Sequence, residues 1–292
     1  SGGFQIATGA LAWSKEIRSD IFNWLENNSD VAVNLDIPPR SKYEGKFYEC
    51  LDISYDNFKW FNENQSGKTK FLGVIQGYTE LSQYETWYDK VKGFDFNGWC
   101  VGSGDTMSRL LYATAVLLKK KEFENKNNQY IHYLGQTKVS DFFLYTLIQR
   151  GFDTHGMNHV QVMTDSSSPV MFPIYGVVVW DADIRKMSYI SHNFKTKTDK
   201  NTKTDAMYIE TADFYSKFKT PVEKYIDYET IKRYNTETRH LLAYHNLYNF
   251  LSIIKDIKGA CSAHLEDLEG LTTPHFAKVA KSVLMMFDDP EN

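Results

Sequence analysis

Short apolar runs recur along the first part of the chain, and each run stops at a polar or glycine position. A segment with helical character follows each run. Such runs are typical of buried parallel strands, and repeated strand–helix units of roughly thirty residues indicate a parallel α/β fold. The pattern predicts strands at residues 31–36 (VAVNLD), 71–76 (FLGVIQ), 98–102 (GWCVG), 130–134 (YIHYL) and 160–163 (VQVM).

Apolar residues at helical spacing separate these strands, most clearly within residues 106–121. Gly151 is expected to cap the last of these helices. The Gly2–Gly3 pair beside an aromatic residue is typical of a tight loop that leaves a strand. The predicted helices cover residues 13–25, 48–61, 80–91, 106–121 and 140–150.

The rhythm changes after residue 165. Residues 171–180 and 187–194 have the pattern of two hairpin strands. Residues 195–205 (KTKTDKNTKTD) form a basic, low-complexity loop that is either simply solvated or in contact with phosphate. Helices are then predicted at residues 222–234, 238–257 and 273–287. No linker separates these parts, so the sequence predicts one domain, 1–292.

Composition and charge limit the classes of function. The formal net charge is −4, so any nucleic-acid binding has to use a local basic patch. Cys50, Cys100 and Cys261 lie far apart and suggest neither a disulfide framework nor a thiolate metal site, which fits a reducing cytoplasm. No apolar run approaches the length of a membrane span. We expect a cytoplasmic protein that binds no membrane.

The polar residues at the predicted strand ends are the first candidates for chemistry. In a parallel barrel the carboxyl ends of the strands meet at one mouth, and this is where such folds keep their active sites. Asp36, Gln76, Ser103 and Asp165 would gather there. Asp165 has a structural alternative, because a strand-end aspartate followed by three serines can cap the next turn. Asp153 is a rival carboxylate, but it follows a predicted helix rather than a strand.

Six motifs occur along the chain in the order SGGFQ, LDIPP, GVIQG, GWCVGSG, HYLG and TDSSSP. Together they resemble the tRNA-guanine transglycosylase superfamily, in which a TIM barrel exchanges guanine for a 7-deazaguanine. The resemblance covers about residues 1–170. It implies an α/β fold, a TIM (β/α)8 barrel lacking its first strands in this numbering. Residues 1–170 would run from the end of strand three to strand eight, and residues 171–292 would form a β-hairpin and C-terminal helices.

The closer likeness is to the phage branch of this superfamily, the DNA 7-deazaguanine transglycosylases (DNA-guanine transglycosylases). The tRNA enzymes carry a cysteine-rich zinc site that a late histidine completes. His245, followed by Asn246, matches that histidine, but the cysteines are missing, and structural zinc needs four ligands. We also expect no appended RNA-binding domain at the C-terminus. We therefore expect no metal or other cofactor, and DNA rather than tRNA as the partner, in the cytoplasm of a phage-infected bacterial cell.

The resemblance also bears on the start of the chain. In the family, an aspartate that acts as acid/base immediately precedes SGG at the end of the third barrel strand. That residue would lie just before Ser1, outside this sequence, after three strands of about 90 residues. A barrel without these strands would expose core edges. We expect that this numbering begins inside a longer protein, or that a separate segment completes the barrel.

The family roles are carried over residue by residue. Asp165 matches the nucleophile that attacks C1′ of the sugar, as in retaining glycosidases. Asp36 and Gln76 match the groups that face the N1–H and 2-amino donors and the O6 acceptor of guanine. Phe4 and Leu134 would stack on the two faces of the base. The other expected pocket contacts are Ser1, Gly2, Gln5, Gly102, Ser103 and Gly135; Ser103 stands where the family has a second glycine.

Structural alternatives remain for three of these residues. Asp36 could be an ordinary aspartate before Pro38–Pro39, Gln76 an ordinary strand-end glutamine, and Phe4 a core phenylalanine. A target base must leave the duplex, and basic groups would offset that cost. The candidates are Arg40, Lys42, Lys195, Lys197, Lys200 and Lys203.

The hypothesis is a transglycosylase that inserts a 7-deazaguanine derivative into DNA. The alternatives are the same exchange on tRNA, a non-catalytic subunit that binds base or nucleic acid, and an unrelated barrel enzyme such as a glycosidase.

Overall fold

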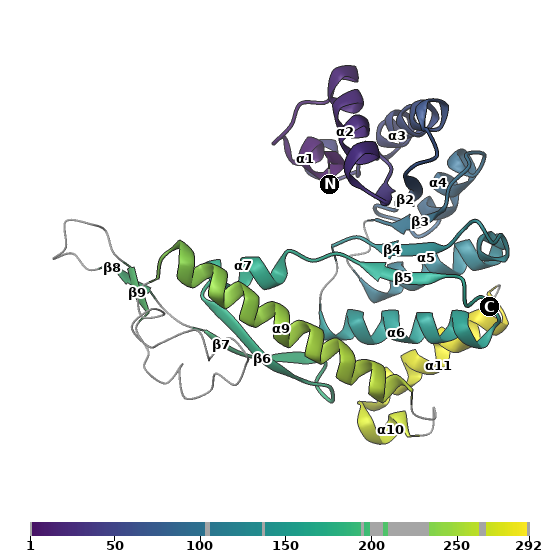
Figure 1. Cartoon of the computed structure of the whole chain (residues 1–292). Coiled ribbons are helices and arrows are strands. Elements are labelled where there is room, and N and C mark those ends of the chain that lie inside the picture. The colour runs from purple at the N-terminus through teal and green to yellow at the C-terminus, as the bar shows by residue number, and fades with distance from the viewer. Residues whose placement is uncertain are drawn as a thin grey trace. The chain divides into compact units, whose positions relative to one another are not determined.

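The computed structural model describes residues 2–102, 106–135, 138–193, 196–198, 207–209, 234–262 and 267–290 (Figure 1). The chain divides into two compact units. The first comprises residues 1–136, 148–164 and 282–292, and the second comprises residues 137–147 and 165–281. The single domain expected for 1–292 stays a prediction.

The first unit contains a curled, five-stranded parallel sheet with the geometry of a half-barrel. Its strands follow one another in the sheet in the same order as in the chain, and each neighbouring pair is parallel. The five strands predicted from the apolar runs are thus confirmed, whereas the complete eight-stranded barrel stays a prediction. The strands are β1 (Val31–Val33), β2 (Lys70–Ile75), β3 (Gly98–Val101), β4 (Tyr130–Tyr133) and β5 (Gln161–Thr164).

The five predicted helices around this sheet are also present. Side-chain caps fix two of their starts: Ser14 accepts a hydrogen bond from the Ile17 N–H, and Thr106 accepts one from the Arg109 N–H. The helices are α2 (Lys15–Asn28), α3 (Phe47–Asn64), α4 (Gln83–Val91), α5 (Met107–Lys119) and α6 (Val139–Thr154), with short 3-10 turns at η1 (Ser41–Tyr43) and η2 (Glu122–Glu124).

Aromatic rings pack α2 and α3 against β2. The rings of Phe22 and Phe61 lie 5.0 Å apart in an edge arrangement, and Phe61 lies 5.4 Å from Phe71 on the strand. Edge-to-face contacts of this kind add to the stabilisation that burial of the rings provides. Aromatic residues make up 15% of the sequence. The contacts described above show that some of them join helices α2 and α3 to the sheet.

The first glycines do not form the predicted tight loop, because α1 (Gly2–Thr8) begins at Gly2. A Cβ atom on Gly3 would lie 1.9 Å from the backbone oxygen of Asp36. The glycine is needed for the close approach of α1 to the segment after β1, rather than for a turn.

Gly151 does not cap α6, because this helix continues to Thr154. A Cβ atom at position 151 would lie 2.3 Å from the ring of Phe287 in α11 (Pro274–Asp288). The same ring contacts Phe152 and His155, with centroids 5.0 and 5.5 Å away. The glycine provides room for an aromatic ring instead of ending the helix.

The second unit contains the predicted hairpin, made of β6 (Val177–Asp183) and β7 (Ser188–Asn193) in antiparallel pairing. The predicted start of its first strand at residue 171 is wrong, because α7 (Ser168–Ile174) occupies that stretch. Pro169 lies in the first turn of α7, where proline favours a helix. Figure 1 shows the long helix α9 (Thr236–Cys261) alongside β6 and α7.

Other predictions for the second unit have mixed outcomes. The basic loop predicted at 195–205 contains a strand, β8 (Thr196–Thr198), which pairs with β9 (Met207–Ile209). Helix α9 confirms the prediction at 238–257, and α11 confirms the one at 273–287, while α10 (Leu268–Leu271) was not predicted. The helix predicted at 222–234 lies outside the described residues except for Tyr234. Within the described ranges, no helix has both the length and the apolar character needed to cross a membrane.

Replacing Gly151 with alanine tests the packing explanation. We expect a loss of about 1–3 kcal/mol in the free energy of unfolding, because the Phe287 ring has to move within packed surroundings. Gly259→Ala is the matched control: it lies in α9 with open space around the position. It should stabilise the protein by up to about 1 kcal/mol.

Urea unfolding measures both variants. Adding Phe287→Leu to Gly151→Ala should recover part of the loss. Equal stabilisation by the two alanine substitutions would contradict the proposed role of Gly151.

Candidate functional site

The carboxyl ends of β1 to β4 lie along one edge of the parallel sheet, and hydrogen bonds continue up to this edge. The Asn34 N–H donates to the Leu72 oxygen (3.0 Å), the Gly102 N–H to the Ile75 oxygen (3.0 Å), and the Leu134 N–H to the Val101 oxygen (3.2 Å). Four of the predicted site positions, 36, 76, 102 and 134, follow these strand ends. Parallel α/β folds bind their ligands at this kind of edge.

Asp36 and Gln76 lie together at this edge. The Gln76 Nε2 donates a hydrogen bond of 2.6 Å to the Asp36 Oδ2. Their residues are only 4% and 2% exposed. The structure thus brings these two predicted site residues together, and their role toward the edge of a guanine base stays a prediction.

Three polar side chains hold the segment that carries Asp36. The Leu35 N–H donates to the Asn34 side chain at 2.9 Å, and the Ile37 N–H donates to the Ser54 hydroxyl at 2.8 Å. The Asn57 amide donates to the Leu35 oxygen at 3.2 Å. These contacts replace ladder bonds after β1 has ended, and they fix the direction of the Asp36 side chain.

Ser54 and Asn57 were not predicted from the sequence. A signal for them existed, because both lie at helical spacing from the apolar residues of α3 and so share its core face. Their partners are backbone groups of a loop about twenty residues earlier in the chain, and periodicity alone does not identify such partners.

Glycines bring the backbone close to the pair. A Cβ atom on Gly102 would lie 2.2–2.4 Å from the side-chain amide of Gln76. The Tyr84 hydroxyl donates to the Gly102 oxygen at 3.0 Å and fixes that backbone. Position 102 therefore has to be glycine for the Gln76 amide to occupy its observed place.

Burial raises the pKa of Asp36 to about 6, although the hydrogen bond from Gln76 opposes the shift. The neighbouring Cys50 thiol is also affected: burial first, and then the charges of Glu49 and Asp36, raise its pKa to about 12. Cys50 thus stays a neutral thiol at physiological pH. Asp36 is a carboxylate whose negative charge is poorly hydrated. Any hydrogen-bond donor that binds beside it would stabilise that charge.

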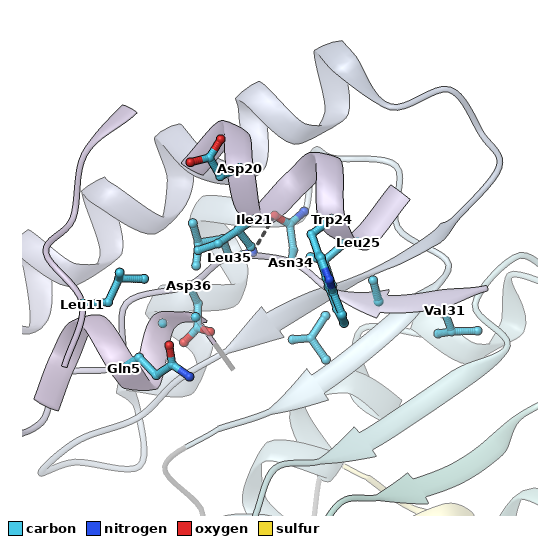
Figure 2. Close-up of a pocket in the computed structure, with 14 residues that line it drawn as sticks. Gln5, Leu11, Asp20, Ile21, Trp24, Leu25, Val31, Asn34, Leu35 and Asp36 are labelled. Carbon is cyan, nitrogen blue, oxygen red and sulfur yellow. Dashed lines mark hydrogen bonds between the residues drawn. The ribbon is translucent and has the colours of Figure 1, made fainter. Parts of the chain in front are cut away.

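A cavity of about 580 Å³ lies beside Asp36, between α1, α2 and β1. Figure 2 shows Asp36 and Gln5 toward the left of this cavity and Trp24 farther to the right. Its volume lies in the usual range for small-molecule sites. Gln5 and Gly2, both predicted as pocket residues, line it, whereas Gln76 is not part of its lining.

Phe4 is not a core residue, because 48% of its surface is exposed. The Arg40 guanidinium carbon lies 6.0 Å from the centroid of its ring, a cation–π distance. Arg40 and Lys42 are both exposed. The alternative of a core phenylalanine is therefore wrong, whereas contact between Phe4 and a ligand stays a prediction.

The remaining predicted residues have varied surroundings. Leu134 is half-buried, and Gly135 is exposed with a left-handed φ of 69°. Lys197 lies in β8, where only the backbone is described. Outside the described residues lie Ser1, Ser103, Lys195, Lys200 and Lys203.

Asp165 directly follows Thr164, the last residue of β5, and it is exposed. The turn after it has its own acceptor, since the Ser168 N–H donates to the Ser166 hydroxyl at 2.9 Å. The rival, Asp153, lies inside α6 and accepts a hydrogen bond of 3.0 Å from Gln149 one turn earlier. Asp153 is therefore a helix-surface residue.

His245 is fully buried in the second unit. Its Nε2 lies 3.0 Å from the Asn249 amide nitrogen, and the Trp180 ring lies 5.1 Å away. Burial lowers the pKa of His245 to about 4, so the ring is neutral at physiological pH. Within the part of the chain that the structure describes, no group of three or more His, Cys, Asp or Glu residues could hold a metal ion.

No protein-family model and no curated protein sequence matches this chain.

The raised pKa of Asp36 predicts a pH-dependent stability. Between about pH 4 and pH 6 the folded protein keeps a proton on Asp36 that the unfolded chain has lost, so the free energy of unfolding falls as the pH rises through this range. Asp36→Asn should remove this fall, which is on the order of 3 kcal/mol. Urea unfolding from pH 4 to pH 8 measures the difference.

Asp153→Asn is the matched control and should keep the wild-type pH profile. Equal pH profiles of the wild type and Asp36→Asn would contradict the assignment of a perturbed carboxyl at position 36.

Proposed function

We propose that this protein is a base-exchange transglycosylase that replaces guanine in DNA with a 7-deazaguanine derivative. The observation that carries the proposal is the buried Asp36–Gln76 pair at the carboxyl edge of the sheet. A buried carboxylate with a raised pKa in such a position is a recognised indication of function.

The pair matches the hydrogen-bonding edge of guanine. The Asp36 carboxylate has acceptor sites for both N1–H and the 2-amino group while it keeps its bond from Gln76. The Gln76 amide carries two hydrogens, so one can remain on Asp36 while the other is donated to O6. Guanine and 7-deazaguanines share this edge, which is what an exchange between them requires.

The proposed chemistry consists of two displacements at C1′ of the target nucleotide. In the first, an oxygen of Asp165 forms a bond to C1′, the glycosidic bond breaks, and guanine leaves with its electron pair. In the second, the incoming base attacks C1′ and releases the aspartate, which retains the configuration. The exchange also needs an acid/base group that protonates the leaving guanine and deprotonates the incoming base.

The target nucleotide has to leave the duplex for this reaction. The exposed Phe4 ring provides a stacking surface, with Leu134 expected on the other face of the base. Arg40 and Lys42 offer positive charge to the phosphates beside it. DNA is preferred to tRNA because the chain lacks the zinc cysteines of the tRNA enzymes to which its motifs are similar.

Base exchange tests the proposal directly. The full-length protein is incubated with radiolabelled guanine and either duplex DNA or tRNA, and we expect label in the DNA. Asp165→Asn should abolish both incorporation and a covalent adduct with the nucleic acid, whereas Asp153→Asn should leave both unchanged.

Label that enters tRNA alone would overturn the choice of DNA. Unchanged exchange by Asp165→Asn would remove Asp165 as the nucleophile. Binding of guanine without exchange into either nucleic acid would favour a non-catalytic subunit.

A further inference from the structure

Tyr84 is a fully buried residue in the first turn of α4. A Cβ atom on Gly77, the residue directly after Gln76, would lie 2.4 Å from the Tyr84 ring, so the ring packs directly on the backbone at that point. The Tyr84 hydroxyl donates a hydrogen bond of 3.0 Å to the Gly102 oxygen. One side chain therefore contacts the backbone just beyond the ends of both β2 and β3.

Both backbone groups of Gly102 are engaged in hydrogen bonds. Its N–H donates to the Ile75 oxygen at 3.0 Å, and its oxygen accepts the bond from Tyr84. These two bonds fix the backbone that lies against the Gln76 amide, where a Cβ atom on Gly102 would come within 2.2–2.4 Å of the amide atoms. The space open to the amide therefore depends on the Tyr84 hydroxyl.

The turn between Gln76 and α4 is held by a second side chain of the same helix. The Gln83 Oε1 atom accepts hydrogen bonds from the backbone N–H groups of residues 78–80, at 2.7, 2.9 and 3.3 Å. Because Gln83 and Tyr84 are neighbours in the chain, these bonds also keep the Tyr84 ring in place beside Gly77. The first turn of α4 is thus the support for the backbone around Gln76.

The orientation of the Gln76 amide decides what the site presents to a base. The ionised Asp36 carboxylate only accepts hydrogen bonds, so the Gln76 Nε2 atom has to face it. One N–H of the amide then remains for an acceptor such as the O6 atom of guanine. An amide free to turn would have a weaker bond to Asp36, and it would present its donor to O6 for only part of the time.

We propose that Tyr84 is a positioning residue: acting through Gly102, it holds the Gln76 amide donor toward the O6 atom of a bound guanine. This inference rests on the proposed function of the Asp36–Gln76 pair. Phenylalanine would fill the same space at position 84, so the hydroxyl alone carries the role. Without the hydroxyl, the buried Gly102 oxygen loses this donor.

Calorimetric titration of guanine into the full-length Tyr84→Phe variant tests the positioning role. We expect about tenfold weaker binding than in the wild type, because the Gln76 amide is no longer held. Tyr88→Phe is the matched control: it makes the same change one turn later in α4, where the buried Tyr88 hydroxyl donates to Glu122. It should leave guanine binding unchanged, and equal weakening by the two variants would overturn the proposal.

Titration of the Asp36 carboxyl tests the same role without a ligand. Carbon-13 NMR of labelled aspartate side chains should show a higher pKa of Asp36 in Tyr84→Phe, by roughly 0.5 to 1 pH unit, because the bond from Gln76 stabilises the ionised form. Tyr88→Phe should keep the wild-type titration. In a Gln76→Ala background, Tyr84→Phe should add no further shift, because Tyr84 acts on Asp36 through the amide.

An unchanged Asp36 titration in Tyr84→Phe, or an equal shift in the Gln76→Ala background, would overturn the proposal. A wild-type protein that binds no guanine, while Tyr84→Phe still shifts the Asp36 titration, would overturn the proposed function but support the positioning of Gln76 by Tyr84.

Discussion

The hydrogen bond between the Gln76 amide and the buried Asp36 carboxylate is the contact on which this site depends. Burial of a carboxylate is unfavourable unless other groups supply the hydrogen bonds that water would provide. Ser54 and Asn57 fix the loop that carries Asp36, and Gly102 gives the Gln76 amide its space. The parallel order of β1, β2 and β3 brings these distant segments to one edge of the sheet.

This arrangement leaves Asp36 with a pKa raised to about 6, because burial opposes full ionisation of the carboxylate near neutral pH. A ligand that brings two N–H donors would relieve that cost, and a purine with the guanine edge has such donors next to an acceptor for the Gln76 amide. The same burial of the Asp36 carboxylate that reduces stability would therefore contribute to recognition of such a ligand. The relief of this cost by N–H donors is the physical reason why the proposal assigns guanine, rather than a sugar alone, to this edge of the sheet.

Much of the first unit was predictable, because each strand is an apolar run that ends at a marked polar or glycine position. The wrong predictions concern residues whose role depends on a contact with a residue distant in the sequence. Gly151 has the sequence position of a helix cap, but glycine is required there because a Cβ atom would clash with the Phe287 ring. Glycine is required at position 3 because a Cβ atom would clash with the backbone of Asp36. Asp36 and Gln76 were predicted to act together, whereas the supporting Ser54 and Asn57 were not, since their contacts depend on the fold of a loop. The predicted role of Asp165 as the nucleophile is supported by its position directly after β5 and by the TDSSSP motif around it.

Calorimetric titration of guanine, 7-deazaguanine and adenine into the full-length protein tests the recognition of the guanine edge most directly. The Asp36–Gln76 pair predicts that guanine and 7-deazaguanine bind and that adenine does not, because adenine has an amino donor where guanine has O6. Gln76→Glu should weaken guanine binding by about a hundredfold, since a carboxylate would then face O6 without a donor. Equal binding of adenine and guanine, or unchanged guanine affinity in Gln76→Glu, would contradict the account.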